Sequence, residues 1–249
     1  MIMKKVLRRV YSTYCLLVFA LIFIFLFPVF AILVQKRSWH GWALRLNRFW
    51  AQTFFTLCVI PVEQVFRHDL DPKNQFVFCA NHFSFLDIPV LGLKKNRFVF
   101  VGKSSIAKIP WFGYMYRKLH ITVDRTKLRS KYQTIQRAIK EIDHGKSLVM
   151  FPEGGITSPG PPKMGAFKDG PFRIAIEKQI PIVPVTIPFN WIILPNDGKL
   201  LVRWRKLKVI YHSPITTKGM NVNDIRELKQ KTFDIITGEL EYQNLNGSQ

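Results

Sequence analysis

The chain has 249 residues, enough for one sizeable domain with an appendage, and its 37 Lys and Arg against 16 Asp and Glu give a formal net charge of +21. This excess indicates an anionic partner, either nucleic acid or a membrane surface. The three cysteines, Cys15, Cys58 and Cys79, are scattered, so they exclude a disulfide framework and show no metal-ligand spacing. We therefore predict no metal site and a reducing environment.

An uncharged apolar run covers residues 14–34 and is long enough to span a hydrocarbon core. It exceeds the apolar region of a signal peptide and has no small-residue cleavage site, which predicts a retained membrane anchor. Both flanks are basic, so they set no direction, and Pro28 can bend the helix. A second helix is predicted at 38–58, where apolar residues form a stripe at helical spacing: Trp42, Leu46, Trp50, Phe54 and Leu57.

Two arrangements remain open for this N-terminal part. The two helices can form a re-entrant or interfacial pair in one leaflet, or the first helix can be a single straight span. We divide the chain into a membrane-anchoring helical motif at residues 1–60, an α/β domain at 61–243 and a tail at 244–249 that we expect to fray.

Beyond residue 60, strand-like and helix-like segments alternate, which predicts an α/β fold with a central mixed sheet flanked by helices. Strands are predicted at 76–80, 97–101, 119–123, 147–151, 181–187 and 200–211. Helices are predicted at 127–144, with Gly145 as the residue just beyond its end, and at 171–179. Residues 157–170 are rich in Pro, Gly and Lys and are predicted as a mobile loop beside the site.

The most informative motif follows the first of these strands, where Asn81 and His82 lead to Ser84 and Asp87. His82 and Asp87 would point about 140° apart on one helix, so they converge only if His82 precedes the helix and Asp87 lies in its first turn. A histidine oriented by a carboxylate can deprotonate a hydroxyl near neutral pH. The alternative is a capping box, with Ser84 as N-cap and Asp87 three residues later.

A second motif follows the strand predicted at 147–151, where Phe151 and Pro152 are followed by Glu153, Gly154 and Gly155. Ligand sites of open α/β sheets gather at the carboxyl ends of strands, so the two motifs can face one cleft. The glycines let backbone N–H groups approach a ligand closely. The alternative is a simple turn.

Together, Asn-His-x-Ser-x-x-Asp and Phe-Pro-Glu-Gly, about seventy residues apart, resemble the glycerolipid acyltransferase family, and most closely the 1-acylglycerol-3-phosphate acyltransferases. The resemblance covers roughly residues 40–215. Residues 103–125 resemble the second block of the family, and 182–185 resemble its fourth. The resemblance implies an enzyme that moves a fatty acyl group from acyl-CoA or acyl carrier protein to the free hydroxyl of lysophosphatidic acid, giving phosphatidic acid. It implies that His82 and Asp87 are catalytic and that no cofactor is needed.

The resemblance also implies a set of substrate-binding residues, with one departure from the family pattern. We expect this set to comprise Asn81, Ser84, Lys103, Arg125, Glu153, Gly154, Gly155 and Lys168. The third block of the family usually continues Glu-Gly-Thr-Arg, and its arginine is thought to help hold the acceptor phosphate, but here Gly155 and Ile156 take the place of Thr and Arg. Either another base, such as Lys103, Arg125, Lys163 or Lys168, grips the phosphate, or the acceptor is a different lysolipid.

The positive charge is concentrated between Lys94 and Lys140, where thirteen Lys or Arg stand against one acid, Asp124. Such a face can dock on anionic lipid or attract the phosphates of a lysolipid, coenzyme A or carrier protein. The expected partners are therefore membrane lipids, a lysophospholipid acceptor and an acyl donor, without nucleic acid, at the cell membrane with the catalytic domain facing the cytoplasm. Three other functions remain open: the same chemistry on another lysolipid, thioester hydrolysis, and non-enzymatic binding to a membrane surface.

Overall fold

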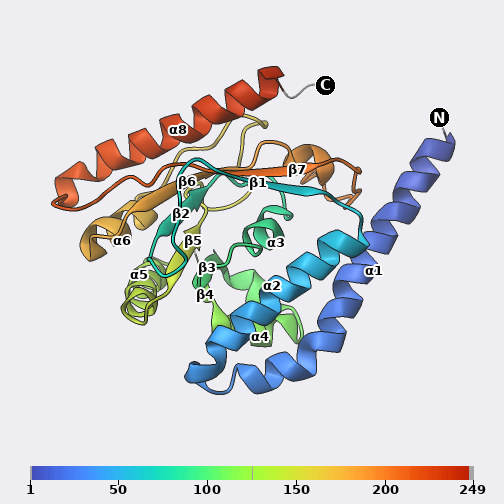
Figure 1. Cartoon of the computed structure of the whole chain (residues 1–249), viewed down its shortest axis with the longest axis horizontal. Coiled ribbons are helices and arrows are strands. Elements are labelled where there is room, and N and C mark those ends of the chain that lie inside the picture. The colour runs from blue at the N-terminus through green and yellow to red at the C-terminus, as the bar shows by residue number, and fades with distance from the viewer. Residues whose placement is uncertain (1, 125, 247–249) are drawn as a thin grey trace.

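The computed structural model describes residues 2–124 and 126–246 and has the predicted α/β fold, with one mixed sheet between two helical layers (Figure 1). In the described residues the sheet has seven strands in the order β1-β7-β6-β2-β5-β3-β4. Neighbours are parallel except β6 and β7, which are antiparallel. The strands are β1 (Val62–Phe66), β2 (Val77–Ala80), β3 (Phe98–Lys103), β4 (Ile121–Val123), β5 (Ser147–Met150), β6 (Ile182–Thr186) and β7 (Leu207–Tyr211).

Side chains of the central strands alternate between the two faces of the sheet, as strand geometry requires. In β2, Val77 and Cys79 pack into one core cluster, while Phe78 and Ala80 pack into the other. Both faces are covered by helices, so these strands are apolar throughout rather than alternating with polar residues. This explains why the buried strands β2, β5 and β6 were recognisable in the sequence.

The helices divide between the two faces of the sheet. One face is covered by α5, α6 and α8, and the other by α2, α3 and α4, with α1 on the outside (Figure 1). The longer helices are α1 (Ile2–Leu33), α2 (His40–Leu57), α4 (Phe112–Leu119), α5 (Leu128–Asp143), α6 (Gly170–Lys178) and α8 (Ile225–Asn246). The short segments are α3 (Asp87–Leu91), α7 (Asn190–Ile193) and the 3-10 turns η1 (Arg37–Trp39), η2 (Ser104–Lys108) and η3 (Val222–Asp224).

Several predicted elements are confirmed, and others are wrong in part. The helices expected at 38–58, 127–144 and 171–179 are α2, α5 and α6, and Gly145 has the positive φ of 76° that favours glycine just beyond a helix end. The strand expected at 119–123 begins only at Ile121, because Leu119 ends α4. The strand expected at 200–211 is confined to β7, and residues 244–246 of the expected tail belong to α8.

The N-terminal helices form a hairpin that is fastened to the domain. Trp50 of α2 donates from Nε1 to the Phe19 carbonyl of α1 at 3.2 Å, and the two rings lie 4.5 Å apart. The predicted stripe of α2 is only partly right: Trp50 and Phe54 are buried, but Trp42 and Leu57 are exposed. The helices are therefore packed as a pair, with the buried side of α2 turned a little from the predicted stripe.

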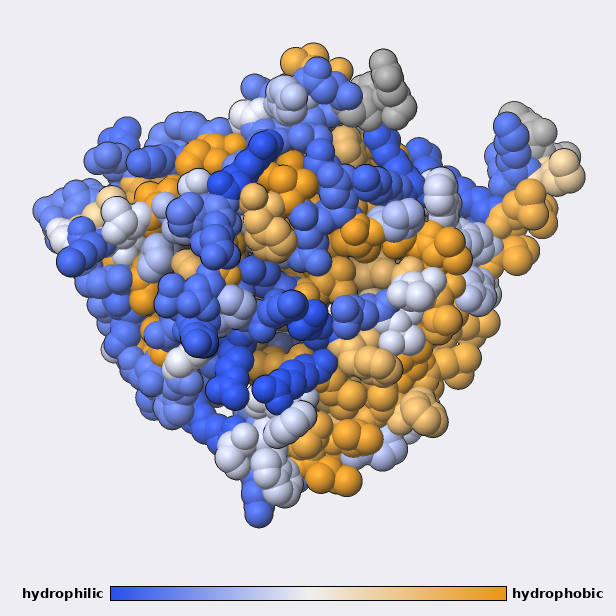
Figure 2. All heavy atoms as spheres, viewed as in Figure 1, coloured by the Kyte–Doolittle hydropathy of each residue, from blue (hydrophilic) through white to orange (hydrophobic). Residues whose placement is uncertain are grey.

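Helix α1 contacts the domain at Ser12 and just past its C-terminal end. Ser12 Oγ accepts the backbone N–H of Val202 at 2.8 Å, and Gln35, just past the helix, donates to the Tyr114 hydroxyl at 2.6 Å. The helix is unbroken through Pro28 and is the one helix of the described chain that is long and apolar enough to cross a membrane. Most of its apolar surface is exposed, and Figure 2 shows a broad apolar area on that side of the molecule.

Candidate active site

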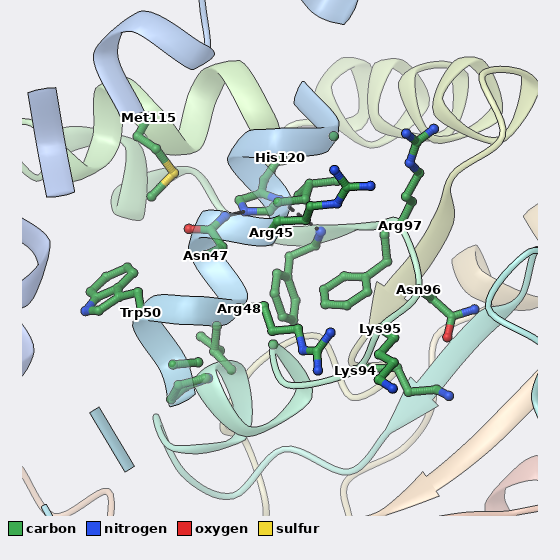
Figure 3. Close-up of a pocket in the computed structure, with 18 of the residues that line it drawn as sticks. Arg45, Asn47, Arg48, Trp50, Lys94, Lys95, Asn96, Arg97, Met115 and His120 are labelled. Atoms are coloured by element: carbon green, nitrogen blue, oxygen red, sulfur yellow. Dashed lines mark hydrogen bonds between the residues drawn. The ribbon is translucent and has the colours of Figure 1, made fainter. Parts of the chain in front are cut away.

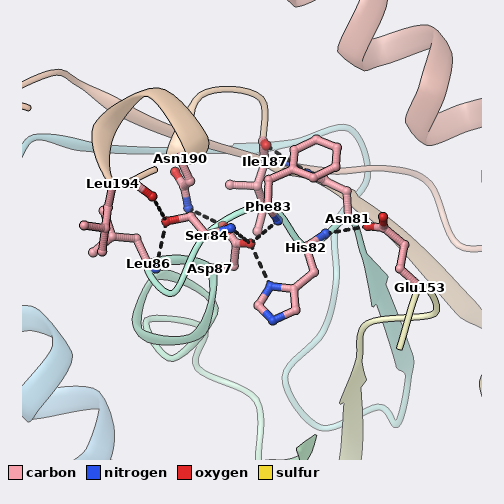
Figure 4. A network of polar contacts seen from close by, with 10 residues as sticks. All are labelled: Asn81, His82, Phe83, Ser84, Leu86, Asp87, Glu153, Ile187, Asn190 and Leu194. Atoms are coloured by element: carbon pink, nitrogen blue, oxygen red, sulfur yellow. Dashed lines mark hydrogen bonds and ion pairs between the residues drawn. The ribbon is translucent and has the colours of Figure 1, made fainter. Parts of the chain in front are cut away.

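The predicted pair of His82 and Asp87 meets at the carboxyl end of β2. His82 lies in the loop after the strand and Asp87 begins α3, which is the arrangement that the five-residue spacing required. The ring Nδ1 of His82 lies 2.9 Å from Asp87 Oδ2, and both side chains are largely removed from solvent, at 9% and 0% exposed. Figure 4 shows the other ring nitrogen pointing away from the carboxylate, where it can meet a ligand.

The Asp87 carboxylate is held by three further hydrogen bonds. Its Oδ2 accepts the backbone N–H groups of Phe83 and Ser84 at 2.8 and 2.9 Å, and its Oδ1 accepts the side-chain amide of Asn190 at 2.7 Å. A carboxylate with this many donors is fixed in orientation. Because an ionised carboxylate only accepts hydrogen bonds, it keeps the proton of His82 on Nδ1 and leaves Nε2 as a base.

The capping interpretation is right about two hydrogen bonds and wrong about the helix boundary. The residue before α3 is Leu86, and the Ser84 hydroxyl donates to the Leu194 carbonyl at 2.8 Å while accepting the Leu86 N–H at 3.2 Å. Asp87 Oδ2 accepts the N–H groups of Phe83 and Ser84 in the loop before the helix, so both side chains of the predicted capping pair hold backbone N–H groups at this junction. The carboxylate therefore organises the loop and orients the histidine at the same time.

Glu153 joins the second motif to the first. Its Oε1 accepts the backbone N–H of His82 at 2.8 Å, and its Oε2 accepts the N–H of Gly165 at 2.8 Å. The side chain is 2% exposed, and burial raises the pKa of its carboxyl group, although the two backbone hydrogen bonds act in the opposite direction. We expected Glu153 to contact substrate, but its geometry is that of a residue that positions the His82 backbone.

Two other predicted substrate-binding residues are structural. Asn81 is fully buried and exchanges two hydrogen bonds with the backbone of Ile187, which ties the exits of β2 and β6 together. Ser84 is fully buried, and its hydroxyl is occupied by the two bonds described above. Both side chains are thus paired within the protein, which position in a motif alone does not show.

Gly154 of the second motif is favoured by its backbone conformation and lies directly below a lysine side chain. Gly154 has a φ of 83°, which favours glycine, and a methyl group there would lie 2.5 Å from Lys168 Nζ. The ammonium of Lys168 therefore lies directly over the loop that carries Glu153. Lys168 is exposed, and its backbone N–H donates to the Pro152 carbonyl at 2.9 Å, which holds the residue beside the loop.

The other residues predicted to bind the acceptor phosphate lie in different parts of the chain. Lys103 ends β3 and is exposed, so it lies at the same carboxyl edge of the sheet as the histidine. Lys163 is exposed in the loop between β5 and α6. Arg125 lies outside the described residues. In the described residues, no group of three or more His, Cys, Asp or Glu side chains is arranged to hold a metal ion.

Two residues of the site were missed. Phe151 stacks on the His82 ring, with the ring centroids 3.9 Å apart and 17° between the ring planes. The phenyl ring therefore supports one face of the imidazole. It stands first in the Phe-Pro-Glu-Gly motif, so its place in that motif was the available signal. Asn190 binds Asp87 but lies 103 residues further along the chain, and nothing local marks it.

Similarity to known proteins agrees with this geometry. A family model described as Acyltransferase matches residues 62–188, which is more than half of the chain. The chain is 31% identical over 140 residues to a chloroplastic 1-acyl-sn-glycerol-3-phosphate acyltransferase of Brassica napus, covering 56% of this chain and 40% of that protein. It is 28% identical over 192 residues to a protein of the same name from Haemophilus influenzae, covering 75% of this chain and 77% of that protein.

The fold also matches a solved structure. The crystal structure of the 1-acyl-sn-glycerophosphate (LPA) acyltransferase PlsC from Thermotoga maritima superposes with a TM-score of 0.75 at 22% identity, covering 95% of this chain and 98% of that one. The chain spans 40% and 45% of the length of the chloroplastic relatives from Brassica napus and Arabidopsis thaliana. The match to the solved structure, which covers 95% of this chain, supports the arrangement of the sheet, the flanking helices and the N-terminal helix pair.

Proposed function

Because the chain belongs to the acyltransferase family, we propose that it transfers a fatty acyl group from an acyl thioester to the free hydroxyl of lysophosphatidic acid, giving phosphatidic acid. The observation that carries this proposal is the buried His82–Asp87 pair at the carboxyl edge of the sheet. The relatives named 1-acyl-sn-glycerol-3-phosphate acyltransferase support the choice of acceptor.

The chemistry follows from the free ring nitrogen. His82 Nε2 takes the hydroxyl proton of the acceptor as the oxygen bonds to the thioester carbonyl carbon. The Asp87 carboxylate stabilises the imidazolium that forms. When the C–S bond breaks, the imidazolium returns the proton to the leaving sulfur, so the ester, the free thiol and the neutral histidine remain. The acyl donor, acyl-CoA or acyl carrier protein, is a substrate in this scheme, which uses no cofactor.

Lys168 is the base that we propose for the acceptor phosphate. Its ammonium lies over Gly154, directly before the two positions at which the loop departs from the family pattern, where Ile156 replaces the arginine. A lysine binds phosphate as a point charge rather than through the paired donors of arginine. This substitution also favours a second candidate, the same reaction on another lysolipid, because a single point charge selects less strongly for a phosphate monoester.

The proposed location is the surface of the cell membrane, with the catalytic domain facing the cytoplasm. The α/β domain holds α1 at Ser12, through Val202, and just past its C-terminal end, through Tyr114, so the helix from Ser12 onward lies along the domain. A helix held in this way favours the interfacial or re-entrant pair over a straight span. The exposed apolar side chains of α1 would enter one leaflet.

The test is thiol release from acyl-CoA by purified protein in detergent, with lysophosphatidic acid, another lysolipid or no acceptor. We expect release that needs lysophosphatidic acid and falls at least about 10²-fold in His82→Ala, the lower range for loss of a general base. His68→Ala, at an exposed histidine, is the matched control. Wild-type turnover in His82→Ala would refute the mechanism. Release without acceptor would identify a thioester hydrolase, and release only with another lysolipid would change the substrate.

A further inference from the structure

A cavity of about 550 Å³ lies on the face of the sheet that α2, α3 and α4 cover, and it reaches α3 at Ile88 and Pro89. Its lining includes residues of α2 and α4 and three segments that precede strands: 72–73 before β2, 94–97 before β3, and Gly145 before β5. Because β2, β3 and β5 are parallel, these segments lie at the sheet edge opposite to the one that carries His82 and Glu153. The cavity volume is in the range of small-molecule sites.

The inside of the cavity is apolar and largely aromatic. The side chains that form it come from α1, α2, β3 and α4, and they are Phe19, Trp50, Phe98, Phe100, Phe112 and Met115. Phe19 and Trp50 pack against each other with ring centroids 4.5 Å apart, and Phe112 meets the Trp50 ring edge-on at 6.0 Å. Such a lining suits a hydrocarbon chain and offers little to a polar ligand.

The lining also carries six cationic side chains: Arg45, Arg48, Lys73, Lys94, Lys95 and Arg97. Figure 3 shows five of them gathered together, away from Trp50 and Met115. Within the part of the chain that the structure describes, no Asp or Glu lines the cavity and none of the six forms an ion pair. The charge of this cluster is therefore left for an anion from outside.

Two cations in this cluster are partly desolvated. Arg48 Nε is buried without a hydrogen-bond partner among the described residues, which is a costly state for a charged donor. Burial lowers the pKa of Lys94, and the charge of Lys95 acts in the same direction, with Asp69 opposing both. The Lys94 ammonium lies over the rings of Phe66 and Tyr211, so Arg48 is the cation of this pair that an anionic ligand would stabilise more.

The cationic cluster adjoins the apolar face that we assign to the membrane. On α2, Arg45 packs on the ring of Trp42 at 4.4 Å, and Trp42 and Phe49 are both exposed. Figure 2 shows strongly hydrophilic side chains bordering the apolar area of the surface. If that area enters the hydrocarbon, the cluster lies at the depth of lipid headgroups, where Lys and Arg meet phosphates.

We propose that this cavity binds an anionic phospholipid, with the phosphate at the cationic cluster and one acyl chain along the aromatic lining. The ligand class follows from the joined chemistry: a free anion leaves the apolar inside unfilled, and a neutral lipid brings no negative charge to the cationic cluster. The site is separate from the acceptor site beside Lys168, since the two lie at opposite edges of the sheet. A bound phospholipid would fasten α2 and the 94–97 loop to the same leaflet as α1.

The probe is phosphatidate with brominated acyl chains, added to His82→Ala protein in neutral detergent so that turnover plays no part. Bromine quenches nearby tryptophan fluorescence, and Trp50 lines the cavity. Subtracting the signal of a Trp50→Phe variant isolates this residue from the exposed tryptophans. We expect saturable quenching by phosphatidate and much weaker quenching by phosphatidylcholine with the same chains.

Charge reversal tests the phosphate contact. Arg45, Lys95 and Arg97 are exposed, so the triple change of these three to Glu should leave the fold intact. It should raise the half-saturating phosphatidate concentration roughly 10²-fold, because about 1 kcal/mol for each of the three cations sums to about 3 kcal/mol. The matched control reverses three exposed cations around α8, on the other face of the sheet: Lys218, Arg226 and Lys231.

Four results would overturn the proposal. Equal quenching by phosphatidate and phosphatidylcholine would show that headgroup charge has no role. Unchanged phosphatidate binding in the triple variant would show that these cations do not bind the lipid phosphate. An equal loss in the control variant would show a general charge effect. Displacement of the lipid by inorganic phosphate at the same concentration would show a site for a free anion. None of these results depends on whether the acceptor is lysophosphatidic acid.

Discussion

Replacement of Glu153 by Gln tests whether Glu153 positions the His82 backbone or binds the acceptor. The carboxylate is 2% exposed and accepts two backbone N–H groups at 2.8 Å, from His82 and Gly165. The amide of Gln can accept only one of them, and its NH₂ group must face the other N–H. A hydrogen bond to a charged group contributes about 1.5–3 kcal/mol, and a buried N–H left without a partner costs about 1–3 kcal/mol. The local structure should therefore shift to relieve this contact.

The shift should appear in turnover rather than in acceptor affinity. A displacement of about 1 Å at a catalytic group can lower the rate about 10²-fold. We expect kcat to fall by about this factor in Glu153→Gln, while the KM for lysophosphatidic acid stays within about twofold. The assay is the initial rate of thiol release across a range of acceptor concentrations. Glu177→Gln, at an exposed glutamate of α6, is the matched control and should leave both constants unchanged. A raised KM with unchanged kcat would refute the positioning role and return Glu153 to the acceptor site.

The other predictions concern the surroundings of the dyad. Asp87→Asn should lower kcat by about 10³- to 10⁴-fold in the same assay, because the imidazolium loses the negative charge that stabilises it. Phe151→Leu should lower kcat roughly threefold to tenfold, since ring stacking on His82 contributes about 0.5–1.5 kcal/mol. Lys168→Ala should raise the KM for lysophosphatidic acid about tenfold, and an acceptor without phosphate should show no change. Because the pKa of Glu153 is raised above its ordinary value of 4.5, the native state keeps this proton to higher pH than the unfolded chain. The stability of the wild type relative to Glu153→Gln, measured by denaturant unfolding, should therefore fall as pH rises from 4.5 through the raised pKa.

The central strands and the dyad could be predicted because their signals are local. The strands β2, β5 and β6 are short apolar runs covered on both faces, and the spacing of His82 and Asp87 allowed one arrangement in which they meet. The edge strand β1 was missed because its residues alternate weakly and are only half-buried. Helix α8 was missed because its buried stripe includes Thr232 and Gln243, which weaken the apolar period.

The roles of the polar motif residues depend on partners that are distant in the chain. Asn81 binds the backbone 106 residues away, and Ser84 binds it 110 residues away. A sequence pattern shows that a polar group is present at a strand exit, but not whether another strand will satisfy it. Buried polar groups are nearly always hydrogen-bonded, so those that find protein partners are withdrawn from the ligand. This is why the predicted binding set was larger than the set that faces the site.

The two interpretations of the first motif, capping and catalysis, describe one carboxylate. Oδ2 of Asp87 accepts the N–H groups of Phe83 and Ser84 as well as the ring of His82. The backbone bonds prevent the carboxylate from rotating away from the ring, so the loop geometry is what makes the histidine a directed base. Both roles require an acid at this position, and spacing alone could not separate them. Asp87→Asn can separate the two roles. Its amide oxygen can keep the backbone hydrogen bonds, while the negative charge beside the His82 ring is lost. A variant that unfolds like the wild type but turns over far more slowly would place the catalytic role in the charge rather than in the loop.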